Sequence, residues 1–286
     1  MPGFRDSLHR LVRRPDETAL CMNSSYFGFF AHAGFLKGLF ELGIRPDHVS
    51  GASAGALVAA ACAAGLSPDE IISTLLAPDL RRSFAEWRTA VRLAGLVTGR
   101  RGFTGVLSGE KILALLKSRL GDRRIQDFRN PSLGIAVTNL SRGRTELKKS
   151  GPAAELVLAS CALPGMFQAS RIGGELYLDG GIADPAPFEH WLDDSQIRRI
   201  IVHLADSDHE TRRGFEKGFS LPGAIQQSHS IINDEILRLK LALAEKSNKD
   251  IIVVRTITPR PGVRKMRAGR LNVELGRRSA LESLGS

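Results

Sequence analysis

The chain reads Val49-Ser50-Gly51-Ala52-Ser53-Ala54-Gly55-Ala56-Leu57, a G-x-S-x-G pentapeptide between a short apolar run and an alanine-rich stretch. The pattern is typical of a nucleophile elbow, a sharp strand-to-helix turn that lifts a serine hydroxyl into a cleft. Gly51 and Gly55 fit this turn because a bulky side chain there would collide with the strand or with a substrate. The pentapeptide therefore indicates an acyl hydrolase whose nucleophile is Ser53.

Length and composition favour one large domain. Of the 286 residues, 43% are hydrophobic, which suffices for a full core. No apolar run approaches the roughly 18 residues that cross a bilayer, and the N-terminus lacks the continuous apolar stretch of a signal peptide. We predict a basic N-terminal segment over residues 1–17, a single domain over residues 18–286, and a cytoplasmic location with peripheral membrane contact.

The three cysteines, Cys21, Cys62 and Cys161, show no spacing typical of metal ligands. Unpaired thiols of this kind are usually buried in proteins of a reducing compartment. We therefore expect no metal site, no cofactor and no catalytic cysteine.

The formal net charge of +10 favours anionic partners such as nucleic acid, acidic lipid or a phosphorylated substrate. Basic residues cluster within residues 5–14, 81–101 and 255–278. Because no helix-turn-helix, zinc-finger or RNA-binding signature accompanies them, we expect lipid headgroups rather than nucleic acid. Apolar residues at helical spacing within residues 4–12 permit two alternatives, packing on the domain or lying on an anionic membrane surface.

Strand and helix patterns alternate along the chain, which predicts an α/β sheet covered by helices on both faces. The expected strands are residues 18–22, 47–50, 133–140, 145–148, 175–178, 200–204 and 251–255. The expected helices are residues 28–42, 53–64, 109–119, 152–159 and 223–247, and one that begins with a capping box at residues 67–70. Glycines inside the first helix indicate close backbone packing or ligand approach. The basic residues 81–105 permit no firm assignment, and a lid or a surface excursion fits them.

A second motif, Leu176-Tyr177-Leu178-Asp179-Gly180-Gly181, places an aspartate at the end of an expected strand. Gly180 and Gly181 let the backbone turn away, which leaves the Asp179 carboxylate at the strand tip. An aspartate followed by two glycines is also a common turn, so the motif alone permits a purely structural interpretation.

Four ordered segments together resemble the patatin-like phospholipase family, over residues 18–205 closely and over the C-terminal third loosely. The segments are Gly28-Phe29-Phe30-Ala31-His32-Ala33-Gly34-Phe35-Leu36, similar to the family's G-x-x-H-x-G-V-L helix start, Ile44-Arg45-Pro46-Asp47-His48-Val49 before the elbow, Ala159-Ser160-Cys161-Ala162-Leu163-Pro164-Gly165-Met166-Phe167, and the D-G-G segment Asp179-Gly180-Gly181-Ile182-Ala183-Asp184-Pro185-Ala186-Pro187. Four motifs in compatible order are far more specific than any one of them.

The resemblance implies a patatin-like three-layer sandwich with a mostly parallel central sheet between helices. It also implies hydrolysis of carboxylic esters in lipids, phospholipids above all, through an acyl-serine intermediate. Ser53 maps to the nucleophile and Asp179 to the general base of a Ser–Asp dyad that uses no histidine, metal or cofactor. Burial beside a hydroxyl raises the pKa of a carboxyl above its usual value of about 3.9, which makes Asp179 a stronger base.

The loop expected to hold the oxyanion departs from the family pattern. That pattern is G-G-G-x-R-G, whereas the corresponding residues here are Asn23-Ser24-Ser25-Tyr26-Phe27-Gly28, so that only Gly28 is retained and a phenylalanine replaces the arginine. Backbone N–H groups donate whatever the side chain is, so we expect Ser24, Ser25 and Ala54 to form the oxyanion hole. Serine resists positive φ, so we expect a strained or less glycine-like loop.

Two alternatives stay open. A Ser–Asp–His triad of the α/β-hydrolase type fits the chain order, and its histidine would be His190, His203, His209 or His229. A lipid-binding protein of low catalytic activity on the same fold is the second alternative, because the oxyanion loop is altered. His32 is expected to be packed or bonded to backbone rather than catalytic. The oligomeric state is not predicted.

Overall fold

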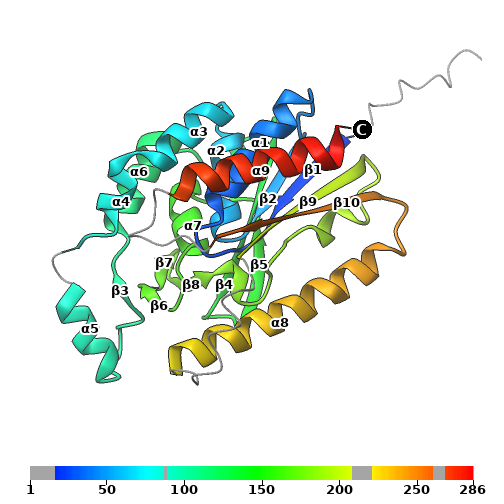
Figure 1. The fold of residues 1–286 in the computed structure, drawn as a ribbon. Helices are drawn as coiled ribbons and strands as arrows, with labels where there is room; N and C mark the ends of the chain where they lie inside the picture. The colour runs from blue at the N-terminus through cyan, green and yellow to red at the C-terminus, as the bar shows by residue number, and fades with distance from the viewer. Residues whose placement is uncertain (1–16, 87–88, 208–220, 260–267, 286) are drawn as a thin grey trace, which may run out of the picture.

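The computed structural model describes residues 17–86, 89–207, 221–259 and 268–285, which form an α/β sandwich (Figure 1). Its centre is an eight-stranded sheet. In sheet order the strands are β10 (Asp250–Thr258), β9 (Ile197–Ser207), β1 (Glu17–Met22), β2 (His48–Gly51), β4 (Ser132–Asn139), β8 (Glu175–Asp179) and β7 (Ser170–Ile172), and β5 (Arg144–Lys148) pairs with β4 as well.

Parallel pairing joins β10, β9, β1, β2 and β4, and antiparallel pairing joins β4 to β5 and β8 and joins β8 to β7. This confirms the predicted mostly parallel sheet. Strand β4 brings two other strand ends together. Gly51 at the end of β2 pairs with Ile135 of β4, and Asp179 at the end of β8 pairs with Val137 of β4. The end of β2 and the end of β8 therefore meet along β4, only two residues apart in its register.

Helices cover both faces of this sheet (Figure 1). One face carries α1 (Phe29–Glu41), α2 (Ala54–Ala63), α7 (Ala153–Ser160) and α9 (Gly269–Leu284), and the other carries α8 (Leu221–Ala244). The remaining helices are α3 (Pro68–Leu76), α4 (Pro78–Ser83), α5 (Thr89–Val97) and α6 (Glu110–Leu120). Short strands β3 (Gly105–Leu107) and β6 (Gly165–Phe167) form a separate parallel pair.

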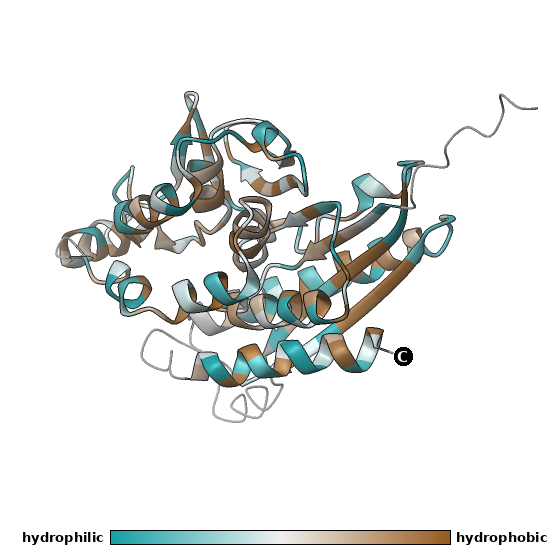
Figure 2. Cartoon of the chain, turned by 90° about the horizontal axis from the view of Figure 1, so that it is seen from above, coloured by the Kyte–Doolittle hydropathy of each residue, from teal (hydrophilic) through white to brown (hydrophobic). Residues whose placement is uncertain are grey.

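Burial on both faces explains the continuous apolar run of β1. Leu20 and Met22 belong to the core beneath α1 and α2, whereas Ala19 and Cys21 belong to the core on the α8 side. All four side chains are fully buried. Alternate residues of a strand face opposite sides, so a strand covered on both sides needs apolar residues at every position. Figure 2 shows the strands largely in brown, while the surrounding helices alternate between brown and teal.

Helices α1 and α9 pack with almost no space between their backbones. A Cβ atom on Gly34 would lie 1.9 Å from the carbonyl oxygen of Val273, and one on Gly276 would lie 2.1 Å from that of Ala31. The prediction that the glycines of the first helix serve close backbone packing is therefore confirmed, and the partner is the C-terminal helix.

Most predicted elements are present within one to three residues of their expected bounds, and the capping box of Ser67 and Glu70 is formed. The sequence reasoning missed α9, the short strands β3, β6 and β7, the helix α4, and the helix α5 inside residues 81–105. Trp87 and the basic N-terminal segment up to residue 16 lie outside the described residues. Within the described ranges, none of the helices combines the length and apolar character needed to cross a membrane.

Substitution of Gly34 by alanine tests the α1–α9 contact. The new Cβ would collide with backbone, so we expect the free energy of unfolding to fall by about 2–3 kcal/mol in denaturant titrations. Gly43→Ala is the control, because no heavy atom lies within 4 Å of its added Cβ and only its positive φ of 76° opposes alanine. That strain costs about 1 kcal/mol. A Gly34→Ala protein as stable as wild type would contradict this packing.

Candidate active site

Ser53 lies on a sharp turn between β2 and α2. Its backbone angles are φ 50° and ψ −116°, an unusual combination for a residue other than glycine. A Cβ atom on Gly55 would lie 2.1 Å from the carbonyl oxygen of Met22, and one on Gly51 would lie 2.4 Å from the carbonyl carbon of Gly55. Only glycine fits at these two positions, which explains the G-x-S-x-G pattern in steric terms.

The Ser53 hydroxyl donates a hydrogen bond to the Asp179 carboxylate, with an Oγ–Oδ2 distance of 2.7 Å. The other carboxylate oxygen, Oδ1, accepts the backbone N–H of Gly181 at 2.8 Å. Asp179 is 3% exposed, whereas Ser53 is half-buried. The two side chains are 126 residues apart in sequence, and they meet because β2 and β8 end beside each other on β4.

Burial raises the pKa of Asp179 to about 7, although the hydrogen bonds from Ser53 and Gly181 act in the opposite direction. A carboxyl with this pKa is partly ionised near neutral pH and holds a proton far better than an exposed aspartate. A general base works best when its pKa lies near the working pH, so Asp179 is suited to take the proton of Ser53.

The backbone of Asp179 is fixed at three points. Thr138 Oγ1 donates to its carbonyl oxygen at 2.8 Å, and its own N–H donates to the carbonyl of Ala162 at 3.1 Å. A Cβ atom on Gly180 would lie 2.1 Å from the carbonyl oxygen of Ala136 on β4. The glycine after the aspartate therefore lets the chain pass close over β4, which fixes the direction of the carboxylate.

Two residues that sequence reasoning assigned no role hold the elbow itself. Ser160 Oγ accepts the N–H of Ser53 at 2.9 Å and donates to the carbonyl of Ala136 at 2.7 Å. The Cys161 thiol donates to the carbonyl of Ser53 at 3.3 Å. Burial raises the pKa of this thiol far above its usual range, so it is a neutral donor and no nucleophile. The sequence signal for this pair is their place in the Ala159–Phe167 segment, one of the four that carry the family resemblance.

The oxyanion loop differs from its prediction at Ser24. The N–H of Ser24 donates to the carbonyl of Pro185 at 2.7 Å, so this amide is already engaged and its assignment to the oxyanion hole is corrected. The N–H groups of Ser25 and of Ala54, the first residue of α2, have no acceptor within hydrogen-bonding distance in the described part of the chain. Of the donors expected from the sequence, these two stay free among the described residues.

The strain of the loop falls on Phe27, whose φ is 56°, and not on a serine. Its ring is buried and packs against Tyr26, Phe29 and Phe84 with centroid distances of 4.8, 5.5 and 5.6 Å. Gly28 is closely packed, since a Cβ atom there would lie 1.7 Å from Ser25 Oγ and 2.8 Å from Ser25 Cβ. An aromatic cluster thus holds the loop where the family pattern has an arginine.

Comparisons with known proteins give the family and the fold of this chain. Residues 20–191 match the family model described as patatin-like phospholipase. This chain belongs to the patatin-like phospholipase family. Its fold resembles that of VipD from Legionella pneumophila, with a TM-score of 0.51 at 17% identity over 95% of this chain and 67% of the other.

Several curated proteins are also related to this patatin-like chain. It is 30% identical over 175 residues to an uncharacterised NTE family protein of Mycobacterium tuberculosis, which covers 59% of this chain and 44% of that protein. It is 30% identical over 195 residues to the lysophospholipase NTE1 of Pyricularia oryzae, which covers 65% of this chain and 12% of that protein. The chain therefore spans less than half the length of these relatives.

The described histidines do not complete a triad in this patatin-like site. His203 is fully buried and stacks on Phe35 with a centroid distance of 3.9 Å, and His229 Nε2 lies 3.2 Å from the carbonyl of Ile182. His190 packs on Trp191. None of them bonds Ser53 or Asp179 within the described ranges, and His209 lies outside these ranges.

His32 is packed and bonded to backbone, as expected from the sequence. Its Nε2 lies 3.0 Å from the carbonyl of Asn23, and its Nδ1 lies 2.8 Å from Nδ1 of His203, whose Nε2 lies 2.8 Å from Thr256 Oγ1. Thr256 in turn bonds Ser279 of α9 at 2.5 Å. Burial lowers the pKa of His32 to about 3 and that of His203 well below its usual value, so both rings are neutral at pH 7.

Each neutral ring carries a single N–H, and this fixes which nitrogen donates and which accepts in the hydrogen bonds of His32 and His203. His32 donates from Nε2 to the Asn23 carbonyl, so its Nδ1 must accept the Nδ1–H of His203. His203 Nε2 then accepts the hydroxyl of Thr256, whose Oγ1 lies next to Oγ of Ser279. These hydrogen bonds link the C-terminal helix to Asn23, the first residue of the oxyanion loop, and they give the buried polar groups partners.

Helix α8 holds the D-G-G segment from the opposite side. Asn233 donates to the carbonyl of Gly181 at 2.9 Å, and Lys240 pairs with Asp184 and, at 2.7 Å, with Glu189. The Lys240 side chain is only 15% exposed. These contacts anchor the backbone that follows Asp179.

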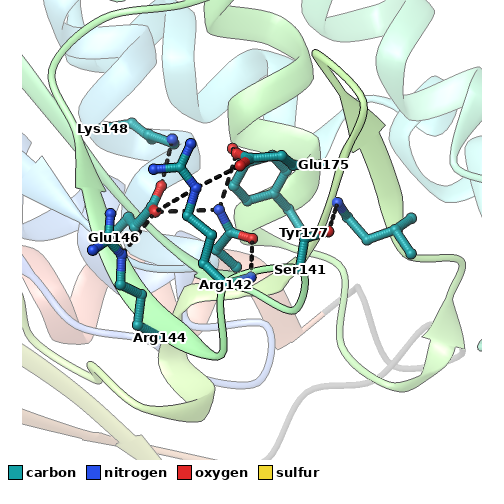
Figure 3. Close-up of polar contacts among 9 residues, drawn as sticks. Ser141, Arg142, Arg144, Glu146, Lys148, Glu175 and Tyr177 are labelled. Carbon is teal, nitrogen blue, oxygen red and sulfur yellow. Dashed lines mark hydrogen bonds and ion pairs between the residues drawn. The ribbon is translucent and has the colours of Figure 1, made fainter.

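The other end of β8 is held by a cluster of ion pairs (Figure 3). Glu175 accepts Arg142 Nε at 2.5 Å and the Tyr177 hydroxyl at 2.6 Å, and these contacts lower the pKa of its carboxyl to about 2. Glu146 accepts Arg144 at 3.1 Å and Lys148 at 2.5 Å. The cations here are paired with carboxylates, so this cluster stabilises the β4–β5–β8 edge rather than offering a free anion site.

The raised pKa of Asp179 predicts a pH-dependent stability. Folding raises this pKa from 3.8 to about 7, so the contribution of the bound proton is fully present below about pH 4 and is lost as the pH rises through about 7. Asparagine resembles the protonated acid in shape and does not ionise, so it avoids the cost of a buried negative charge at high pH. We expect Asp179→Asn to have the larger free energy of unfolding near pH 8, by about 1–3 kcal/mol, and a smaller advantage near pH 5.

Denaturant titrations of both proteins across this range measure the difference. Asp69→Asn is the control, because the side chain of Asp69 is 75% exposed. The same pH dependence in wild type and Asp179→Asn would contradict the burial of an ionisable Asp179.

Proposed function

We propose that this protein hydrolyses a carboxylic ester of a lipid through an acyl-Ser53 intermediate, with Asp179 as the base. The observation that carries the proposal is the 2.7 Å hydrogen bond from Ser53 Oγ to a buried carboxyl whose pKa is raised to about 7. Membership of the patatin-like phospholipase family supports a lipid substrate. The proposed mechanism needs no metal or other cofactor.

In the first step, ionised Asp179 takes the Ser53 proton while Oγ attacks the ester carbonyl carbon. The carbonyl electron pair moves onto oxygen, and the resulting oxyanion accepts the N–H groups of Ser25 and Ala54. Ala54 begins α2, where unpaired amides and the helix dipole favour negative charge. This assignment keeps two of the three donors expected from the sequence.

In the second step, the oxyanion re-forms the carbonyl and the alcohol leaves with the proton that Asp179 holds. Water then attacks the acyl-Ser53 ester and gives its proton to Asp179. Collapse of this second oxyanion releases the fatty acid and returns the proton to Ser53 Oγ. One carboxyl acts alternately as base and acid, which a pKa near 7 favours.

We propose a phospholipid as the substrate, met at an anionic membrane surface by a protein that acts in the cytoplasm. One relative of this chain bears the name lysophospholipase, which supports an acyl ester of this class. The net charge of +10 supports attraction to acidic headgroups.

A second candidate is a lipid-binding protein with little turnover. The hydrogen bond of the Ser24 amide to Pro185 favours this second candidate, because it removes one of the donors expected for the oxyanion hole. Each such donor contributes about 10²–10³ to the turnover rate in serine hydrolases.

Kinetics with purified variants test the proposed dyad. We expect Ser53→Ala to abolish turnover of phospholipid and of a soluble short-chain ester, and Asp179→Asn to lower kcat by roughly 10³ or more. In wild type, kcat/KM should rise with pH and reach half its maximum near pH 7, because only ionised Asp179 accepts the proton. Unchanged products in both variants would contradict the dyad, and lipid binding without turnover in wild type would favour the second candidate.

Histidine variants test the triad alternative separately. We expect His190→Ala, His209→Ala and His229→Ala to retain turnover of the soluble ester within a few-fold of wild type. His203→Ala should lower stability more than turnover, because its ring is buried and bonded to His32 and Thr256 rather than to Asp179. A loss of several orders of magnitude in one of the four, with an unchanged circular dichroism spectrum, would establish a histidine base instead.

A further inference from the structure

Helix α5 presents an apolar face to solvent. Val91, Leu93 and Val97 are 64%, 49% and 78% exposed, and Ala90 and Ala94 are exposed as well. These are all the exposed residues of the helix. A surface helix normally turns its apolar side inward and its charged side outward, so α5 is reversed.

The one charged residue of this helix points inward. Arg92 pairs with Glu86 at 2.5 Å, and their side chains are only 15% and 7% exposed. Glu86 also accepts the backbone N–H groups of Ser108 at 2.9 Å and Gly109 at 3.1 Å. A buried carboxylate with this many donors is a firm anchor, so the outward direction of the apolar face is built into the fold.

A second contact fixes the helix to the short sheet near the active site. The ring of Phe103 packs against Gly95, where a Cβ atom would lie 2.6 Å from the ring. The chain then enters β3, which pairs with β6, and β6 begins four residues after Cys161, whose thiol bonds the Ser53 carbonyl. Helix α5 stands at the outer end of this arrangement, away from the central sheet (Figure 1).

Exposed cations border the apolar face. Arg100 and Arg101 lie three and four residues after the end of α5, and both are exposed. In the described part of the chain, no carboxylate lies within ion-pairing distance of either guanidinium. An apolar helix face followed by arginines that form no ion pair with the described carboxylates matches an anionic bilayer, which offers acyl chains beneath a layer of negative headgroups.

We propose that α5 is the docking surface of this protein for an anionic lipid bilayer. Leu93 and Val97 enter the boundary between headgroups and acyl chains, and Arg100 and Arg101 bind the headgroup phosphates. A face on a helix of nine residues is small for a stable protein interface, which buries about 800 Å² on each partner, whereas a bilayer accepts a single apolar face. This surface deepens the proposed function, because it is where the hydrolase would meet its lipid substrate. Only that link to the substrate rests on the proposed function.

Co-sedimentation with vesicles tests the docking surface. The probes are phosphatidylcholine vesicles with and without phosphatidylserine, and the protein is the full chain. We expect Leu93→Ser/Val97→Ser to weaken binding to the anionic vesicles by about tenfold or more, because two exposed apolar side chains no longer enter the lipid. Arg100→Gln/Arg101→Gln should weaken binding to the vesicles that contain phosphatidylserine and leave binding to pure phosphatidylcholine unchanged.

Ile231→Ser/Ile232→Ser is the matched control. These residues lie on α8 and are 53% and 54% exposed, so the substitution removes a similar apolar area elsewhere and should leave vesicle binding unchanged. Equal vesicle binding by wild type and Leu93→Ser/Val97→Ser would overturn the proposal. A change of mass in solution with that double substitution, without an effect on vesicles, would identify α5 as an interface between copies of the chain and overturn it too.

Turnover of the soluble short-chain ester separates docking from chemistry. We expect both α5 variants to hydrolyse this ester at the wild-type rate, because neither substitution touches Ser53 or Asp179. If wild type binds vesicles through Leu93 and Val97 but hydrolyses no ester, the proposed function fails and the docking surface stands.

Discussion

The hydrogen bond between Ser53 and Asp179 depends on the close approach of two strand ends. Strand β2 and strand β8 both stop beside β4, and the turns that follow them are tight enough to require glycine at positions 55 and 180. The same burial that brings the side chains together raises the pKa of the carboxyl to about 7. Fold and chemistry are thus set by a single constraint, the space left between backbone segments.

Several layers of contacts maintain this constraint. Ser160 and Cys161 hold the elbow, and α8 anchors the segment after the aspartate through Asn233 and Lys240. The neutral pair of His32 and His203 connects the oxyanion loop to the C-terminal helix. Full burial lowers the pKa of both rings and keeps them neutral, and ionising His32 would turn its Nδ1 into a donor that faces the Nδ1–H of His203.

Alternating strand and helix patterns predicted the fold class, and the resemblance of four ordered segments to the patatin-like family paired Ser53 with Asp179. They missed α9, where two glycines lower helix propensity, although those glycines serve its contact with α1. They also misassigned the Ser24 amide, because its partner Pro185 lies far away in sequence. The outward apolar face of α5 was not predicted either. The spacing of apolar residues alone does not distinguish a helix face that points to solvent from one that points to the core.

Labelling with a fluorophosphonate, followed by peptide mass spectrometry, tests the dyad most directly. The account predicts one adduct on Ser53, a labelling rate that rises with pH to half its maximum near pH 7, and a rate lowered by orders of magnitude in Asp179→Asn. An adduct on another residue, or Ser53 labelling at the wild-type rate in Asp179→Asn, would contradict it.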